Sequence, residues 1–159
     1  MENPLPVPLI VCEQTGQWAA GLRQELRGTT LKLQETRLLD DAWQSLAAAP
    51  AAFVVVEYTA KNSNELLRRY VWFTRDYPQA RLAIVAARRY ISHRWLLRSA
   101  GAVHTVFSPR ELAPLAELAC RHIAQIPQPQ LPVTERIWRS LPWGKSGATS
   151  ITTMSDSRE

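Results

Sequence analysis

The sequence predicts an α/β fold in which a doubly wound sheet of five parallel strands, in the order 2-1-3-4-5, is covered by helices on both faces. Five short apolar segments alternate along the chain with five segments of helical spacing. Three of the apolar segments are apolar throughout, which is typical of strands that are buried on both faces. The length of 159 residues, 46% of them hydrophobic, is enough for one domain of about 120 residues and a tail.

The expected strands are short segments rich in β-branched and other apolar residues. They cover residues 8–12, 31–35, 52–56, 82–86 and 103–107. The first, third and fourth segments contain no charged residue. The second alternates Leu31 and Leu33 with Lys32 and Gln34, a pattern that predicts a half-exposed strand at the edge of the sheet.

Each expected helix carries apolar residues three or four positions apart, so that they share one face. These residues are Trp18, Leu22 and Leu26; Leu39, Trp43 and Leu46; Leu66, Leu67, Tyr70 and Val71; Trp95 and Leu96; and Leu112, Leu115, Leu118, Ala119 and Ile123. Because helices joined to parallel strands by right-handed crossovers lie on both sides of a sheet, the alternation favours the doubly wound arrangement.

Boundary residues agree with this division. Ser108, Pro109 and Glu111 have the order of a capping box that opens the last helix, and Gly101 is placed to close the fourth. After Ile126 the composition changes to a proline-rich segment, and the chain ends in a stretch rich in Ser and Thr. We therefore expect a folded domain over residues 1–126 and a linker with a disordered tail over 127–159.

Composition also bounds location and partners. The chain has 19 Lys and Arg against 14 Asp and Glu, a net charge of +5, which favours acidic partners or nucleic acid. No segment approaches the ~20 apolar residues of a membrane helix, so we expect no membrane contact. The N-terminus lacks the basic start of a secretory signal. We expect a cytoplasmic protein in which Cys12 and Cys120 stay reduced.

Five short motifs in register resemble the receiver domain of response regulators, a flavodoxin-like fold, over residues 6–126. Leu9-Ile10-Val11-Cys12-Glu13-Gln14 resembles the first strand with its acidic pair, and Val54-Val55-Val56-Glu57 the third strand with its phosphoacceptor. The segments 64–69 and 97–102 resemble the third helix and the Ala-Gly-Ala turn, and Phe107-Ser108-Pro109 lies where receivers have Lys-Pro.

The resemblance implies a Mg²⁺ site, an acceptor aspartate, a Thr or Ser and a Lys that contact the phosphate, and an aromatic residue that follows the switch. A hard cation such as Mg²⁺ requires carboxylate ligands, and the charge that develops on a phosphoryl group during transfer requires a cation held in position beside it. Each position departs from the family pattern. Glu13 and Gln14 occupy the positions of the acidic pair, and Glu57 replaces the acceptor aspartate. Ala86 stands at the position of the Thr or Ser, Ser108 at that of the Lys, and Thr105 at that of the aromatic residue. The longer side chain of Glu57 also moves its carboxylate outward by ~1.5 Å.

We therefore expect a pseudo-receiver, a protein-interaction adaptor that is not an enzyme and is not phosphorylated on an aspartate. Three interpretations of the remaining carboxylates stay open. Glu13 and Glu57 are two solvated side chains in a vestigial crevice, or Glu57 mimics a phosphorylated acceptor, or the pair forms a weak cation site. No cofactor and no metal ion is expected.

A basic cluster over the expected fourth helix is the first candidate for partner binding. It consists of Arg88, Arg89, Tyr90, Arg94 and Arg98. Arg94 and Arg98 are four residues apart and share a helix face. The chain uses 16 Arg and 3 Lys, which favours bidentate pairing with carboxylate or phosphate. A solvated surface, a protein partner, a homodimer and a nucleic acid all stay open, with protein ahead of nucleic acid.

The tail contains the second candidate, the segment 135–143. Its residues Ile137, Trp138, Leu141 and Trp143 are too apolar for a plain solvated tail, and Trp is prominent in interface energetics. The segment either docks on a partner or folds back on its own domain.

Other site chemistry is weaker. Gly144-Lys145-Ser146 resembles the end of a phosphate-binding loop, but Arg139 stands where the first glycine belongs. No glycine loop follows the first strand, and no two histidines have metal-ligand spacing. An enzyme is therefore the least supported class.

Overall fold

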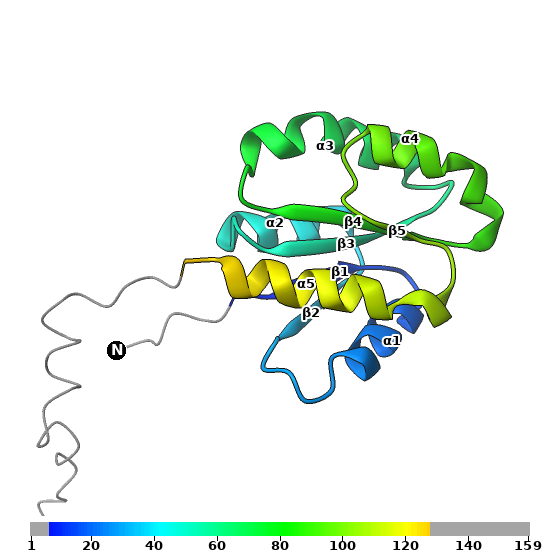
Figure 1. Ribbon diagram of the computed structural model, residues 1–159. Coiled ribbons are helices and arrows are strands. Elements are labelled where there is room, and N and C mark those ends of the chain that lie inside the picture. The colour runs from blue at the N-terminus through cyan, green and yellow to red at the C-terminus, as the bar shows by residue number, and fades with distance from the viewer. Residues whose placement is uncertain (1–6, 128–159) are drawn as a thin grey trace, which may run out of the picture. The chain divides into compact units, whose positions relative to one another are not determined.

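A computed structural model of the chain describes residues 7–127 as a five-stranded parallel sheet between two layers of helices (Figure 1). The strands are β1 (Leu9–Cys12), β2 (Leu33–Thr36), β3 (Phe53–Tyr58), β4 (Arg81–Ala86) and β5 (Thr105–Val106). The helices are α1 (Gln17–Glu25), α2 (Leu39–Ala48), α3 (Ser63–Asp76), α4 (Arg94–Ser99) and α5 (Ala113–Gln125), with short 3₁₀ helices η1 (Arg88–His93) and η2 (Pro109–Glu111). The strand order β2-β1-β3-β4-β5 confirms the predicted doubly wound sheet.

The two sides of the sheet form separate hydrophobic cores. Side chains alternate along each strand, so Ile10 faces the core under α2, α3 and α4, whereas Leu9 and Val11 face the core under α1 and α5. The inner strands β1, β3 and β4 are almost wholly buried, and β2 is half-exposed at the edge. This burial follows the continuous and alternating apolar patterns of the sequence.

The strand at the other edge is shorter than predicted. Only Thr105 and Val106 form β5, although backbone bonds with β4 extend further, from Ile84 N–H to the His104 carbonyl and from Val103 N–H to Leu82. Val103, just before β5, is exposed.

The predicted core faces of two helices need correction. In α4 the buried residue is Leu97, whereas Trp95 is 78% exposed and Leu96 is 42% exposed. The segment begins as η1, and Leu97 then sets which side of the short helix faces the sheet. In α3 the buried residues are Leu66, Tyr70 and Phe73, and Val71 points to solvent.

The boundary of the last helix also differs. The Ser108 hydroxyl accepts a hydrogen bond from Arg110 N–H at 3.3 Å, but it caps η2, and α5 begins only at Ala113. Gly101, with φ of +119°, follows α4 in a conformation that favours glycine. The predicted tail, including the segment 135–143, lies outside the described residues apart from Pro127.

Candidate functional site

A cavity of about 220 Å³ lies at the carboxyl edge of the sheet, where β1 and β3 end. It is lined by Cys12, Glu13, Gln14, Arg37, Leu38, Leu39, Asp40, Glu57, Lys61, Asn62 and Glu65. Three of the six predicted pocket residues, Glu13, Gln14 and Glu57, are therefore brought together here. Doubly wound folds bind ligands at this edge, so the state of these carboxylates decides what the cavity can do.

Glu13 is buried, with 1% of its surface exposed, and its carboxylate caps α1. Its Oε2 accepts a hydrogen bond from Trp18 N–H at 3.0 Å, and its Oε1 accepts one from Ala19 N–H at 2.5 Å. These amides belong to the first turn of α1, which otherwise lacks an acidic residue and a side-chain cap. The interpretation of Glu13 as a solvated carboxylate was wrong, because the chain folds its carboxylate against the positive end of the helix.

Gly16 allows this arrangement. It occupies the N-cap position with φ of +86°, a left-handed conformation that costs other residues energy. A β-carbon at Gly16 would also lie 3.4 Å from the Arg37 guanidinium. Arg37 itself donates a hydrogen bond to the Glu13 carbonyl at 3.2 Å and pairs with Glu35.

Glu57 lies at the end of β3, half-exposed, and its Oε2 accepts a hydrogen bond from Gln14 N–H at 2.9 Å. The carboxylate thus ties β3 to the loop after β1. The Asn62 side chain closes the following loop, because it donates to the Glu57 carbonyl at 2.6 Å and accepts from Thr59 N–H at 2.9 Å. The position of the expected acceptor is held by backbone contacts on both sides.

These residues do not fit the Mg²⁺ ion that receiver chemistry requires. Both oxygens of Glu13 are engaged by helix amides, Gln14 is neutral, and one oxygen of Glu57 is engaged by Gln14 N–H. Among residues 7–127, no group of three or more His, Cys, Asp and Glu side chains is placed to hold a metal ion. Such a cation needs free carboxylate oxygens, and this edge offers too few.

The other three predicted pocket residues do not line the cavity. Ala86 is fully buried at the end of β4, where it pairs with Tyr58. Thr105 is half-buried at the start of β5, and the hydroxyl of Ser108 is used as the cap of η2. No cation or hydroxyl from β4 or β5 therefore reaches the cavity.

An aromatic cluster instead joins the loop after β4 to the loop after β3. The Tyr58 hydroxyl and His93 Nδ1 are hydrogen-bonded at 3.0 Å, and the Tyr90 hydroxyl accepts from Ala60 N–H at 3.1 Å. The rings of Tyr58 and Tyr90 meet edge to face, with centroids 5.3 Å apart. These contacts hold η1 against the start of the loop to α3.

The predicted basic cluster is divided by its contacts. Arg88, Arg89 and Arg98 are all exposed, and the Arg89 guanidinium lies 5.0 Å from the centre of the half-buried Tyr90 ring. Arg94 lies over the ring of Phe107 at 5.1 Å, on the flank of α4 that faces β5. Burial lowers the pKa of His104 below its ordinary value, and the nearby Arg98 and Arg94 lower it further.

Sequence reasoning missed most of the cavity wall. Arg37, Asp40, Lys61 and Glu65 come from loops and from the first turns of helices, where no motif marks them. Arg69 pairs with both Asp40 and Glu65 and so ties α3 to α2. Asn62 could have been found, because Asn directly before a helix signals a side chain that bonds the local backbone.

Comparison with known proteins shows that this chain resembles solved structures in its fold. No family model matches the sequence, and no curated protein matches it. A response regulator from Thermotoga maritima superposes with a TM-score of 0.58 and 16% identity, over 75% of this chain and 99% of that one. A CheY-like protein (tadZ) from Pseudomonas aeruginosa gives 0.58 and 13%, over 79% and 98%, and a response regulator receiver protein from Burkholderia phymatum gives 0.55 and 18%, over 77% and 99%.

The chain has the receiver fold. At these identities the likeness is one of fold, and it leaves the chemistry of the site to the residues present. In this chain the Glu13 carboxylate accepts hydrogen bonds from two amides of the first turn of α1. Within residues 7–127 no helix has the length and apolar character to cross a bilayer.

Proposed function

We propose that this protein is a pseudo-receiver, a regulatory adaptor that binds other proteins and does not undergo aspartyl phosphorylation. The observation that carries the proposal is the capture of Glu13 by the amides of Trp18 and Ala19. A carboxylate that caps a helix is withdrawn from metal binding, and phosphoryl transfer in this fold depends on the metal. Glu57 in place of the acceptor aspartate, with its hydrogen bond to Gln14 N–H, supports the same conclusion.

The loop contacts support a constitutive rather than a switched module. The bonds of Tyr58 to His93 and of Tyr90 to Ala60 leave the loop after β4 tied to the loop after β3. A switch needs an element with two arrangements of similar energy, and each added contact favours one of them. We therefore propose that regulation lies in which partners are bound.

Incubation with acetyl phosphate and Mg²⁺ tests the chemical part of the proposal. Intact-mass analysis should show no phosphorylated species, while a receiver domain with an acceptor aspartate is modified in the same reaction. Glu57→Asp should also remain unmodified, because Gln14 and the capping role of Glu13 are unchanged. Phosphorylation of the native chain that disappears in Glu57→Gln would refute the proposal.

The adaptor part is tested by affinity capture with the full chain from a lysate, with and without nuclease. Proteins that are enriched in both arms, and lost with a chain that ends at Pro127, would assign the contact to the tail segment with Ile137, Trp138, Leu141 and Trp143. Enrichment that persists with the shortened chain would assign a second contact to the domain itself.

A nucleic-acid-associated regulator is the second candidate, favoured by one observation. No acidic residue occurs between Asp76 and Glu111, a stretch that carries six arginines. Phosphate contacts by such a segment would give binding that weakens steeply with salt. Nuclease-sensitive capture with that salt dependence would favour this candidate over the adaptor.

A further inference from the structure

The outer surfaces of α3 and α4 expose four large apolar side chains. The exposed fractions are 70% for Val71, 55% for Trp72, 78% for Trp95 and 42% for Leu96. The two helices are neighbours on one side of the sheet (Figure 1), and a β-carbon at Gly101, just after α4, would lie 3.9 Å from the ring of Tyr70 in α3. Exposed apolar groups gathered on adjoining elements mark a surface that another molecule covers.

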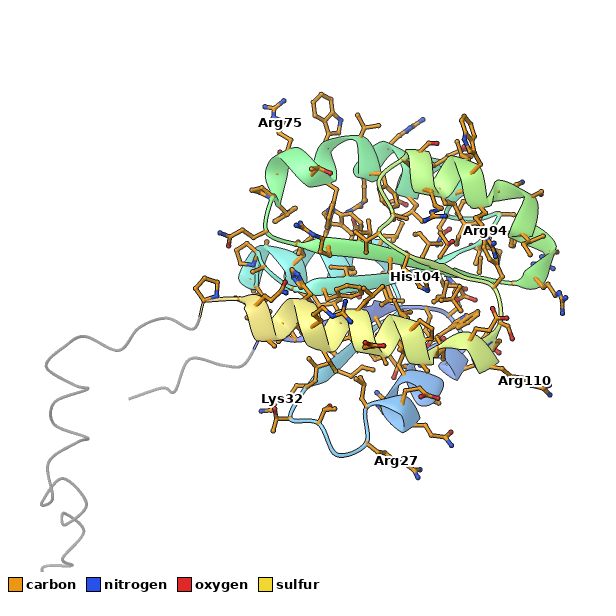
Figure 2. The ribbon with its side chains drawn as sticks, viewed as in Figure 1. Arg27, Lys32, Arg75, Arg94, His104 and Arg110 are labelled. Carbon is orange, nitrogen blue, oxygen red and sulfur yellow. The ribbon has the colours of Figure 1, made fainter. Side chains whose placement is uncertain are left out.

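Arginines accompany these residues on both helices. Arg68 and Arg75 are exposed, lie three or four positions from Val71 and Trp72, and so share their face of α3. The Arg75 guanidinium lies 5.3 Å from the centre of the Trp72 ring. Figure 2 shows Arg75 directed away from the sheet.

On α4 the arginines lie on the far flank. Arg94 contacts Phe107 on the side of β5, and Arg98 is one turn further along the same side. Leu96 is about 200° around the helix from both, which turns it towards the opposite flank. The exposed surface of α3 and α4 therefore combines apolar residues with arginines, which lie between Val71 and Trp72 on α3 and on the far flank of α4. We call this surface, Arg68, Val71, Trp72, Arg75, Arg94, Trp95, Leu96 and Arg98, the α3–α4 strip.

The charge of the strip is uncompensated. In the part of the chain that the structure describes, none of its four arginines forms an ion pair, although five such pairs occur elsewhere. The segment from Tyr77 to Arg110 contains no acidic residue at all. A partner must therefore supply the negative charge as well as an apolar surface.

We propose that the α3–α4 strip binds an acidic amphipathic helix of a partner protein. The apolar face of that helix covers Trp72, Val71, Leu96 and Trp95, and carboxylates on its two flanks pair with the arginines. Arg suits this role because its planar guanidinium binds a carboxylate through two hydrogen bonds. This inference rests on the proposed adaptor function and gives the partner its chemistry.

Other occupants fit less well. Two copies of this chain in a twofold contact would set arginines against arginines. The segment 128–159 carries four Lys and Arg against three Asp and Glu, so it does not supply a negative surface. Bases of a nucleic acid stack on aromatic rings but leave the exposed Val71 and Leu96 without a partner.

The test uses the full chain and a fluorescent designed helix of about 18 residues, about five turns, with leucines on one face and glutamates on both flanks. Fluorescence anisotropy should show binding to this peptide and at least about tenfold weaker binding to its scrambled form. Trp72→Ala with Trp95→Ala, and separately Arg75→Glu with Arg98→Glu, should each weaken binding by about tenfold or more.

Arg27→Glu with Lys32→Glu is the matched control. It changes the net charge by the same amount, and Figure 2 places both residues on the side of the sheet opposite to Arg75. This variant should bind the peptide within about twofold of the native chain, since only distant charges change. Far-ultraviolet circular dichroism of each variant confirms that it is folded.

Equal affinity for the scrambled peptide, or equal loss in the control variant, would overturn the proposal. Vesicles with about one fifth phosphatidylserine and an oligothymidylate of about 20 nucleotides are further arms. Strip-dependent binding to either one, in place of the peptide, would replace the acidic helix with a membrane or a nucleic acid. The acetyl phosphate assay does not depend on peptide binding. If the peptide does not bind, that assay still tests the proposed lack of phosphorylation on its own.

Discussion

At the scale of single residues, Glu13 and Glu57 show how neighbours assign different roles to one side-chain type. Glu13 is buried and meets two amides of α1, whereas Glu57 is half-exposed and meets one amide of a loop. Both stand at the carboxyl ends of strands, Glu13 after β1 and Glu57 in β3. Both oxygens of Glu13 and one oxygen of Glu57 accept hydrogen bonds from backbone amides.

The first prediction compares the two carboxylates. Glu13→Gln should lower the free energy of unfolding by about 2 kcal/mol, because an amide NH₂ replaces one of two acceptor oxygens at a buried helix end. Glu57→Gln is the matched control and should cost less than about 1 kcal/mol, since its remaining carbonyl oxygen can still accept from Gln14 N–H. Urea unfolding measures both values. Equal effects of the two variants would contradict the capping role of Glu13.

The second prediction concerns the pH dependence of stability. Burial, with Arg98 and Arg94, lowers the pKa of His104 below the ordinary 6.5, so the unfolded chain binds the proton more readily than the folded one. The contribution of His104 to stability is therefore full above that value, falls as the pH drops below it, and levels off below the pKa of the folded state.

Urea unfolding at about pH 7.5 and about pH 5.5 checks this, with His104→Asn as the comparison. The variant should lose less stability between the two conditions than the native chain. In Arg94→Gln with Arg98→Gln, nuclear magnetic resonance titration should show the pKa of His104 raised towards its ordinary value. An unchanged pKa would mean that burial alone sets it.

At the scale of elements, α1 and α5 approach closely because Gly21 has no side chain. A β-carbon there would lie 2.5 Å from Leu112 Cδ1, and Leu112 is buried just before α5. The sequence predicted both helices but not this contact, because the residues are ninety-one positions apart in the chain.

The third prediction is a double-mutant cycle. Gly21→Ala alone should lower the free energy of unfolding by about 1 kcal/mol, since the clash with Leu112 outweighs the better helix propensity of Ala. In a Leu112→Ala background the same change should stabilise by up to about 1 kcal/mol, because the clash is gone. Chemical unfolding of the four chains measures the coupling. Additive effects would mean that the helices can separate at no cost.

Element types and strand positions were predictable, whereas the rotation of α4 was not. Trp95 and Leu96 are as apolar as Leu97, and a helix of six residues is too short for periodicity to choose among them. α4 directly follows η1, and Tyr90 and His93 attach η1 to Ala60 and Tyr58 through hydrogen bonds that no local pattern reveals. Val71 is a different case, because α3 has 14 residues and Val71 lies about 100° around that helix from the buried Tyr70.

At the scale of the whole molecule, the sheet separates two cores that share no side chain. Ile84 faces the core under α2, α3 and α4, and Leu115 belongs to the core under α1 and α5. The three inner strands join both cores into one folding unit, because β1, β3 and β4 each supply residues to both faces.

The fourth prediction follows from this layering. Ile84→Val should cost about 1 kcal/mol and Leu115→Ala about 3 kcal/mol, and the double variant should lose their sum within about 0.5 kcal/mol. Urea transitions followed by circular dichroism and by fluorescence should coincide for all chains. Transitions that separate would show that the two cores unfold independently.

The sequence by itself determined the α/β class, the five strands and their order, because runs of apolar residues and their spacing are properties of local sequence. Only the tertiary structure decided that Glu13 caps α1, that Ala86, Thr105 and Ser108 stay away from the cavity, and that α3 and α4 expose one shared apolar strip. These features depend on which distant backbone or helix lies beside a residue. A pattern along one segment carries no information about such a neighbour, since packing against the rest of the fold selects it.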